Sequence, residues 1–173
     1  EVVEQAGPDV TRFHMLTRKN DAPLDFDFDK VLEQTRENPV WYVQYASARI
    51  HSVLERAAEQ GVAVDDAALA QADLSVLSHP AEIEVMRKLG EWPRQVEIAA
   101  RANEPHRVAF YLYDLAGALH GLWNRGHEDA SLRFVQDGDV ATTGAKIALA
   151  RGVGVVISAG LAILGVTPAR EMR

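Results

Sequence analysis

Apolar residues recur every three or four positions through four long segments of this 173-residue chain. That spacing places the apolar side chains on one face of an α-helix. We therefore predict long helices over residues 39–60, 80–103, 105–125 and 141–164. Asn38 and Pro39 are a typical N-cap and first helical residue for the earliest helix. Pro93 lies inside the second helix and favours a kink there, while Gly165 and Pro168 end the last one.

The rest of the chain predicts shorter elements. Asp9 is the expected N-cap of a helix that ends near Lys19. Residues 20–29 alternate apolar and acidic side chains as a strand does, but no second strand is evident, so we expect an extended link with buried aromatic residues. Residues 61–78 favour a loop with one short helix. Together these elements predict an all-α bundle of about five to seven helices.

The composition fits one soluble globular domain, with 47% hydrophobic and 25% charged residues. The absence of cysteine excludes disulfides and thiolate zinc sites and favours a cytosolic protein. The sequence begins with Glu1 and shows no signal-peptide pattern, so we interpret it as a piece of a longer protein. The longest uncharged apolar run, Val153 to Val166, is shorter than the about 20 residues that span a bilayer, which predicts a buried helix and no membrane.

The charge is unevenly distributed along the sequence. The net charge is −7, which argues against non-specific binding to nucleic acid by the chain as a whole. Residues 140–173 nevertheless carry a net charge of +3, and the remainder carries −10. The cations of this basic segment are Lys146, Arg151, Arg170 and Arg173. Such asymmetry permits an anion-binding face on an acidic body.

The helix predicted from Pro39 has three distinct faces at ~100° per residue. Its core face consists of Val43, Ala46, Ile50, Val53, Leu54 and Ala57. Beside the core runs an edge that we call the aromatic–arginine row, which consists of Tyr42, Tyr45, Arg49, Ser52 and Arg56. The third face, predicted to be solvated, consists of Gln44, Ala48, His51 and Glu55.

The aromatic–arginine row has two interpretations. Phenol rings and guanidinium groups along one edge can stack on unpaired bases and bind phosphates, and stacking contributes about 1–3 kcal/mol per base. RNA loops are recognised in this way. The same residues also suit the boundary of a core, half buried with their polar ends in water. Periodicity alone favours the boundary interpretation, because that is the common environment of tyrosine and arginine.

A calcium loop is suggested by three aspartates but is not complete. Asp25, Asp27 and Asp29 imitate the start of such a loop. The glycine required at its sixth position is Lys30, and the glutamate required at its twelfth is Arg36. We interpret the three aspartates as solvated.

Other apparent motifs also lack a required feature. GDVATTGAK at residues 138–146 resembles a phosphate-binding loop, but its glycines and lysine have the wrong spacing. His106 and His120 belong to no metal-binding motif, and we interpret both as structural. Gly152 and Gly154 indicate close helix contact rather than dinucleotide binding. No motif therefore predicts a catalytic, cofactor or metal site.

Four segments, in the family's order, resemble the C-terminal domain of arginyl-tRNA synthetases. They are PDVTRFHMLTRKNDAPLDFDFDKV at 8–31, NPVWYVQYASARIHSVLERA at 38–57, EPHRVAFYLYDLAGALHGLWN at 104–124 and GLAILGVTPAREMR at 160–173. Within the first segment, Asp9 and Arg12 keep the outer residues of the signature after which DALR domains are named. The resemblance covers nearly the whole sequence.

This resemblance implies that residues 1–173 form a DALR-type anticodon-binding domain. About 1–37 would be its first helix and the link from a catalytic domain that lies upstream. The family's HIGH and KMSK signatures for ATP are not in the sequence, so we predict that this piece alone is inactive. The parent enzyme is expected to join arginine to its tRNA in the cytoplasm, using ATP with Mg in the catalytic domain.

The resemblance also assigns roles to individual residues. In the family this domain binds the anticodon stem and loop. Tyr45 matches the tyrosine that stacks on the loop, and Arg49 and Tyr42 match the residues beside it. Met172 matches a C-terminal methionine near the second anticodon base, and Phe134 matches an aromatic residue near the same base.

The residues around this set have simpler expected roles. Arg56 extends the row as a phosphate-binding residue, and the basic C-terminal segment is expected to lie across from it. Asn38 falls where the family places a polar loop contact, although its N-cap role is a sufficient explanation. Asp9 and Arg12 are interpreted as structural, fixing the link to the catalytic domain.

Two other readings remain open. One is a helical protein-interaction or oligomerisation module with Tyr42 and Tyr45 as interface anchors. The other is the equivalent domain of another class I synthetase. On the favoured interpretation, the partners are arginine-accepting tRNA and the catalytic domain of the same protein. DNA and membrane are not expected partners, and we expect a monomer.

Overall fold

The computed structural model describes residues 2–19, 27 and 31–172, and all regular structure among them is helical. The α-helices are α1 (Val2–Ala6), α2 (Pro8–Leu16), α4 (Pro39–Glu59), α5 (Asp66–Leu69), α6 (Pro80–Ala102), α7 (His106–Glu128) and α8 (Val140–Ile163). Two short 3₁₀ helices, η1 (Leu74–Val76) and η2 (Ala130–Leu132), lie in the connections. The predicted all-α bundle is confirmed.

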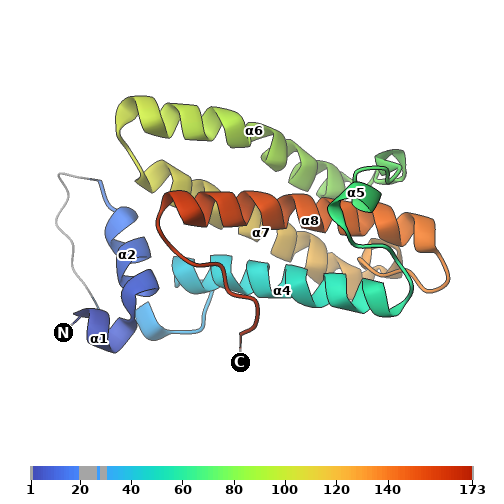
Figure 1. Cartoon of the computed structure of the whole chain (residues 1–173), viewed down its shortest axis with the longest axis horizontal. Helices are drawn as coiled ribbons and strands as arrows, with labels where there is room; N and C mark the ends of the chain where they lie inside the picture. Colours follow the sequence, from blue (N-terminus) through green and yellow to red (C-terminus); the bar gives the residue numbers. More distant parts are fainter. Residues whose placement is uncertain (1, 20–26, 28–30, 173) are drawn as a thin grey trace.

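Four long helices build the bundle, and each runs opposite to the preceding one (Figure 1). The pair α7 and α8 lies between α4 and α6 and contacts both. Helix α2 packs across one end, against α4 and α7, whereas α5 and η1 contact α8. In this arrangement one side of α4 lies beside α7, and another side of α4 faces away from the bundle core.

The predicted long helices agree with the observed ones to within three residues at each end. Local caps explain this agreement. The Asn38 side chain accepts a hydrogen bond from the backbone N–H of Trp41 and donates to the carbonyl oxygens of Val31 and Glu33, both at 2.8 Å. Asn38 thus has the predicted N-cap role. Helix α6 remains helical through Pro93.

The N-terminal prediction was partly wrong. Gly7 is the N-cap of α2, so Asp9 lies in the first turn, and the helix ends at Leu16 instead of Lys19. Gly7 has φ 82°, a left-handed conformation that glycine adopts without steric cost. The extended link predicted for residues 20–29 lies outside the described residues, apart from Asp27, as does most of the aspartate cluster.

Helix α8 provides much of the core. Its close approach to α4 depends on Gly154, where a Cβ atom would lie 3.1 Å from Ile50 Cγ2. The predicted role of this glycine in helix contact is therefore confirmed. Among the described residues, α8 is the one helix long and apolar enough to cross a membrane. Because it packs against α4, α6 and α7, the apolar residues on its inner side serve the bundle core, whereas Val155 and Ile163 are exposed.

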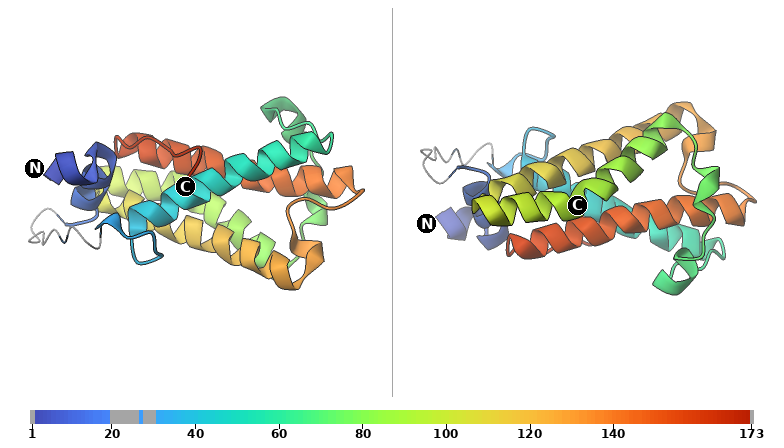
Figure 2. Two further views of the ribbon diagram at one scale, coloured as in Figure 1. Left: turned by 90° about the horizontal axis from the view of Figure 1, so that it is seen from below. Right: turned by 90° about the horizontal axis from the view of Figure 1, so that it is seen from above.

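A C-terminal tail, residues 165–172, turns back from the end of α8 and crosses α4 (Figures 1 and 2). Gln44 Nε2 donates to the Thr167 carbonyl oxygen at 2.8 Å, and Gln44 Oε1 accepts from the Ala169 N–H at 2.7 Å. The Ser47 hydroxyl donates to the Ala169 carbonyl oxygen at 2.8 Å. The third face of α4, predicted to be solvated, is thus partly covered.

The start of the tail is bound by α2. Asp9 Oδ2 accepts from the backbone N–H of Thr167 at 3.1 Å, and Arg12 donates to the carbonyl oxygen of Gly165. Asp9 and Arg12 therefore have a structural role, as predicted. Their partner in this structure is the tail, 158 and 153 residues away in sequence.

Candidate nucleic-acid interface

The aromatic–arginine row lies along the side of α4 that faces α7. Tyr42, Tyr45 and Arg49 all contact His120 of α7, which is 3% exposed. Each of the three row residues is itself only half-buried. The structure therefore brings the first half of the row together around one histidine and leaves part of each side chain accessible.

The hydrogen bonds of His120 define its chemical state. Its Nε2 lies 3.2 Å from the Tyr42 carbonyl oxygen, and its Nδ1 lies 3.0 Å from Arg49 Nη1. A carbonyl only accepts and a guanidinium only donates, so Nε2 carries the hydrogen and Nδ1 accepts. Burial, opposed by the Tyr42 carbonyl and assisted by the Arg49 charge, lowers the pKa of His120 to about 4. The imidazole is therefore neutral at neutral pH.

Tyr45 lies in the middle of a stack along α4. The Trp41 ring is one turn before it, 4.8 Å between centroids and nearly parallel. The Arg49 guanidinium is one turn after it, 4.3 Å from the ring centroid. Such offset stacking and cation–π contacts are individually worth about 0.5–1.5 kcal/mol. Tyr45 is thus ordered before any ligand binds.

The Tyr42 ring packs against two rings of α7, those of His120 and Tyr113. Its ring centroid lies 4.5 Å from that of His120 and 5.1 Å from that of Tyr113. The Arg36 guanidinium lies 5.9 Å from the Tyr42 ring centroid. Burial raises the pKa of Tyr42, so its hydroxyl stays protonated and can donate a hydrogen bond at neutral pH. Arg36 and Tyr113 extend the surface beyond the start of the row.

The other end of the row opens onto a pocket of about 310 Å³. Its lining includes Arg56 and Ser52 of α4, Trp123 of α7, and Arg133 and Phe134 from the segment after η2. The Phe134 ring is 5% exposed and packs against Trp123, with ring centroids 5.5 Å apart. The structure therefore joins Arg56 and Phe134, two of the residues singled out in the sequence, in one concave site of aromatic and cationic character.

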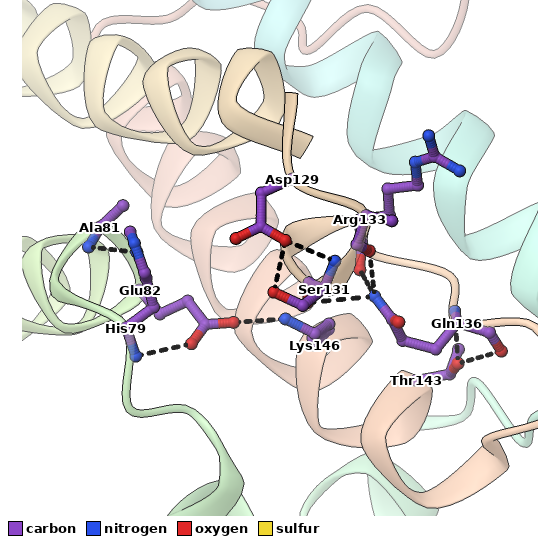
Figure 3. Close-up of polar contacts among 10 residues, drawn as sticks. His79, Ala81, Glu82, Asp129, Ser131, Arg133, Gln136, Thr143 and Lys146 are labelled. Carbon is purple, nitrogen blue, oxygen red and sulfur yellow. Dashed lines mark hydrogen bonds and ion pairs between the residues drawn. The ribbon is translucent and has the colours of Figure 1, made fainter. Parts of the chain in front are cut away.

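Gln136 shapes the loop that carries Phe134 (Figure 3). Its side-chain amide donates towards the carbonyl oxygens of Ala130, Ser131 and Arg133, at 3.0, 3.2 and 2.6 Å. Its backbone N–H donates to Thr143 Oγ1 at 2.9 Å. This network ties the loop to α8 and fixes the wall of the pocket.

Two of the four cations in the basic C-terminal segment are paired with carboxylates. Lys146 is buried and paired with Glu82 of α6, with side chains 6% and 4% exposed (Figure 3). Arg151 pairs with Asp66 at 2.7 Å. At ~100° per residue, the tail-binding residues of α4 also lie on a different side from the row. Lys146 and Arg151 are therefore not available to an anion, and the tail that carries Arg170 is attached to a side of α4 other than the row.

Met172 belongs to the C-terminal tail and is half-buried. The tail is fixed three residues earlier, at Ala169, by Gln44 and Ser47. This attachment limits how far Met172 can move from α4. Its predicted role near an anticodon base stays a prediction.

Several residues of the surface were not assigned to it from the sequence. His120 was interpreted as structural, Trp41 was left out of the predicted row, and Tyr113 and Trp123 were not singled out. Trp41 has a recognisable signal, because it lies four residues before Tyr45 on the same helix. The α7 residues have none, since their positions opposite α4 depend on how the two helices pack.

The described residues do not form a comparable cluster of metal ligands. Across the described part of the chain, no cluster of three or more His, Asp or Glu side chains is suited to a metal ion. The pocket beside Trp123 contains cations and aromatic rings but no carboxylate. Its chemistry suits an anionic or aromatic ligand rather than a metal.

Comparisons with known proteins agree with this chemistry. Residues 43–172 match the family described as DALR anticodon binding domain. Over 173 residues the chain is 73% identical to the arginine–tRNA ligase of Paracoccus denitrificans, and it spans 30% of that protein's length. The arginine–tRNA ligase of Ruegeria pomeroyi is also 73% identical, with the same coverage.

The fold recurs in a solved structure. The chain resembles a Campylobacter jejuni protein assigned to the arginyl-tRNA synthetases, with a TM-score of 0.84 and 26% identity. The match covers 99% of this chain and 35% of that one. Four helices packed in this manner therefore form a known module within longer proteins.

Proposed function

The chain belongs to the DALR anticodon-binding domain family, and from that membership we propose that it binds the anticodon stem and loop of arginine-accepting tRNA. The proposal places it in an arginine–tRNA ligase, as the names of its relatives suggest. The observation that carries it is the cluster of Tyr42, Tyr45 and Arg49 around His120. This cluster presents ordered rings and a cation on one accessible edge.

The proposal extends to the whole protein of which this chain is a part. That protein would be an ATP-dependent ligase that joins arginine to its tRNA in the cytoplasm. Because the chain spans 30% of its relatives' length, we assign ATP and Mg to a catalytic domain outside this sequence. Residues 1–173 are the anticodon-binding domain in this proposal, and the chain acts as a monomer that supplies recognition.

RNA binding at Tyr45 requires a rearrangement of the stack. Trp41 now lies against the Tyr45 ring. An aromatic pair contributes about 0.5–1.5 kcal/mol, whereas a base stacked on an aromatic ring contributes about 1–3 kcal/mol. We propose that an unpaired base takes the place of Trp41 on the Tyr45 ring. Arg49 remains against the Tyr45 ring and meets the phosphates.

The pocket at the end of the row extends this surface. Arg56 and Arg133 supply positive charge, and Trp123, backed by the buried Phe134, supplies a ring face. We propose that a nucleotide next to the one on Tyr45 enters this pocket. Met172 is proposed to approach the same loop from the tail.

The proposed function is tested by titrating the chain with the anticodon stem-loop of an arginine-accepting tRNA at several salt concentrations. Tyr45→Ala is expected to weaken binding by about 1–3 kcal/mol. Trp41→Ala is expected to leave affinity unchanged or to raise it, because the base no longer competes with the indole. Val155→Ala, on the exposed side of α8, is the matched control.

Three outcomes would contradict the proposal. Binding that is indifferent to salt would exclude a phosphate-dominated interface. Equal affinity for a stem-loop with an altered second anticodon base would exclude anticodon recognition. A stable dimer that binds no RNA would instead support the protein-interaction module, with Tyr42 and Tyr45 as anchors.

A further inference from the structure

His120 lies at the centre of the proposed RNA surface without being exposed on it. It comes from α7, whereas the row lies on α4, and 71 residues separate it from Arg49. Its contacts reach the Tyr42 carbonyl oxygen, the Tyr45 ring and the Arg49 guanidinium. One buried side chain thus contacts all three row residues of the cluster on which the proposed function rests.

The two hydrogen bonds of His120 support each other. The Tyr42 carbonyl holds the hydrogen on Nε2, which leaves the Nδ1 lone pair for Arg49. A hydrogen bond at one ring nitrogen of a histidine sets the tautomer, and the tautomer decides whether the other nitrogen donates or accepts. In this arrangement the imidazole is a neutral acceptor, so it directs Arg49 without neutralising its charge.

Arg49 is confined by three groups. His120 accepts from Nη1, the Tyr45 ring lies 4.3 Å from the guanidinium, and the Trp123 ring lies 5.0 Å from it. A free arginine side chain has many rotamers, and ordering it on binding costs affinity. A guanidinium carries five N–H donors, and the His120 bond uses one. The confined cation therefore keeps donors for a phosphate.

We infer that His120 is a positioning residue for RNA binding, which orders Arg49 over Tyr45 before the anticodon loop arrives. This inference rests on the proposed function and assigns a role within the same surface. A purely structural histidine would only fill space between α4 and α7. The two roles differ in whether the ring nitrogens, rather than the ring volume, are needed for binding.

The test compares substitutions that separate volume from nitrogen chemistry. His120→Phe keeps an aromatic ring against Tyr42 and Tyr45 but removes both hydrogen bonds. His120→Asn places an amide oxygen near the position of Nδ1 and retains the acceptor for Arg49. His106→Phe is the control, because His106 is also buried on α7 but contacts Phe110 instead of the row.

Affinity for the anticodon stem-loop is measured for each variant and for the combination of His120→Phe with Arg49→Ala. His120→Phe is expected to weaken binding about tenfold, as Arg49→Ala does, because an Arg49 side chain that is no longer held in place must be ordered when RNA binds. In the Arg49→Ala background it should have little further effect. His120→Asn should recover most of the affinity, and His106→Phe should bind as the unsubstituted chain does. Thermal melts confirm that each variant is folded.

Two results would overturn the inference. One is unchanged affinity in His120→Phe, and the other is a full additional loss when it is combined with Arg49→Ala. If the unsubstituted chain binds no stem-loop, the proposed function fails. The positioning role of His120 is then tested separately, by the mobility of the Arg49 side chain. A rigid Arg49 Nε–Hε signal by NMR relaxation that becomes mobile in His120→Phe supports positioning, whereas equal mobility in both refutes it.

Discussion

Arg49 and Lys146 show how differently two helix cations are used in this molecule. Arg49 lies on α4, half-buried, against a neutral imidazole and two aromatic rings. Lys146 lies on α8, almost fully buried, against the carboxylate of Glu82. The group opposite each cation decides its role. Aromatic rings and a neutral histidine leave a charge available to an anionic ligand, whereas a buried carboxylate satisfies it.

The comparison corrects a conclusion drawn from charge counting. The excess of basic residues in 140–173 suggested an anion-binding face. Two of its cations are paired with carboxylates from other elements, Lys146 with Glu82 and Arg151 with Asp66. A local excess of charge therefore indicates a binding face only when no carboxylate from elsewhere in the fold reaches it.

The largest expected effect is on stability and comes from Lys146→Ala. It leaves the Glu82 carboxylate buried without its cation, which costs about 3–5 kcal/mol of the free energy of unfolding. Urea denaturation measures the loss. Because the pair lies away from the row, RNA affinity of the folded fraction should not change.

A double substitution tests the reason for that loss. Combining Lys146→Met with Glu82→Gln removes both charges and should recover much of the stability, since replacing a buried ion pair by neutral groups of similar size is often tolerated. A double variant as unstable as Lys146→Ala would show that packing, not charge, explains the effect.

Arg49→Ala, unlike Lys146→Ala, should weaken RNA binding. We expect binding to the anticodon stem-loop to weaken about tenfold, or ~1.4 kcal/mol, and the salt dependence of log K to fall by roughly one phosphate contact. The unfolding free energy should fall by about 1–3 kcal/mol, less than in Lys146→Ala, because the Nδ1 atom of the buried His120 loses its donor. The titration and urea experiments used for Lys146→Ala show both effects, and a stability loss larger than that of Lys146→Ala would break the comparison.

Two buried histidines, His120 and His14, should make the stability of the chain depend on pH. The pKa of His120 is lowered to about 4, and the pKa of His14 is also lowered by burial. Between pH 6.5 and about 4, the unfolded chain binds protons that the folded chain excludes, so stability falls as pH falls. We expect a loss of about 1–2 kcal/mol between pH 7.5 and 5. Urea denaturation at both values measures it.

The contribution of His120 to this pH dependence is separable. In His120→Asn the group that resists protonation is absent, so the loss between pH 7.5 and 5 should be smaller than in the unsubstituted chain. An equal loss in both proteins would assign the effect to His14 and other groups.

The smallest expected effect belongs to Arg151→Ala. Its pair with Asp66 is hydrogen bonded but exposed, with side chains 38% and 74% accessible. Exposed pairs contribute about 0.2–1 kcal/mol. The change in unfolding free energy should therefore be close to the error of denaturant extrapolation, and a loss comparable with that of Lys146→Ala would contradict the role assigned to burial.

Much of the fold was predictable because it depends on local interactions. The cap at Asn38, the helix ends and the apolar periods depend on interactions within a few neighbouring residues. The position of Tyr42, Tyr45 and Arg49 on one edge of α4 follows from helical spacing alone. The exact start of α2 was missed, since a glycine N-cap competes with the stronger sequence signal of Asp9.

The sequence by itself therefore determined the long helices, their caps and the membership of the row, because backbone hydrogen bonds and side-chain spacing operate over one or two turns. Tertiary structure alone decided what faces the row and the basic segment. His120 meets Arg49 across 71 residues, Glu82 meets Lys146 across 64, and the tail meets Gln44 across 123. These pairings arise from how α4, α6, α7 and α8 pack, and no local pattern encodes which charge finds a carboxylate and which remains available.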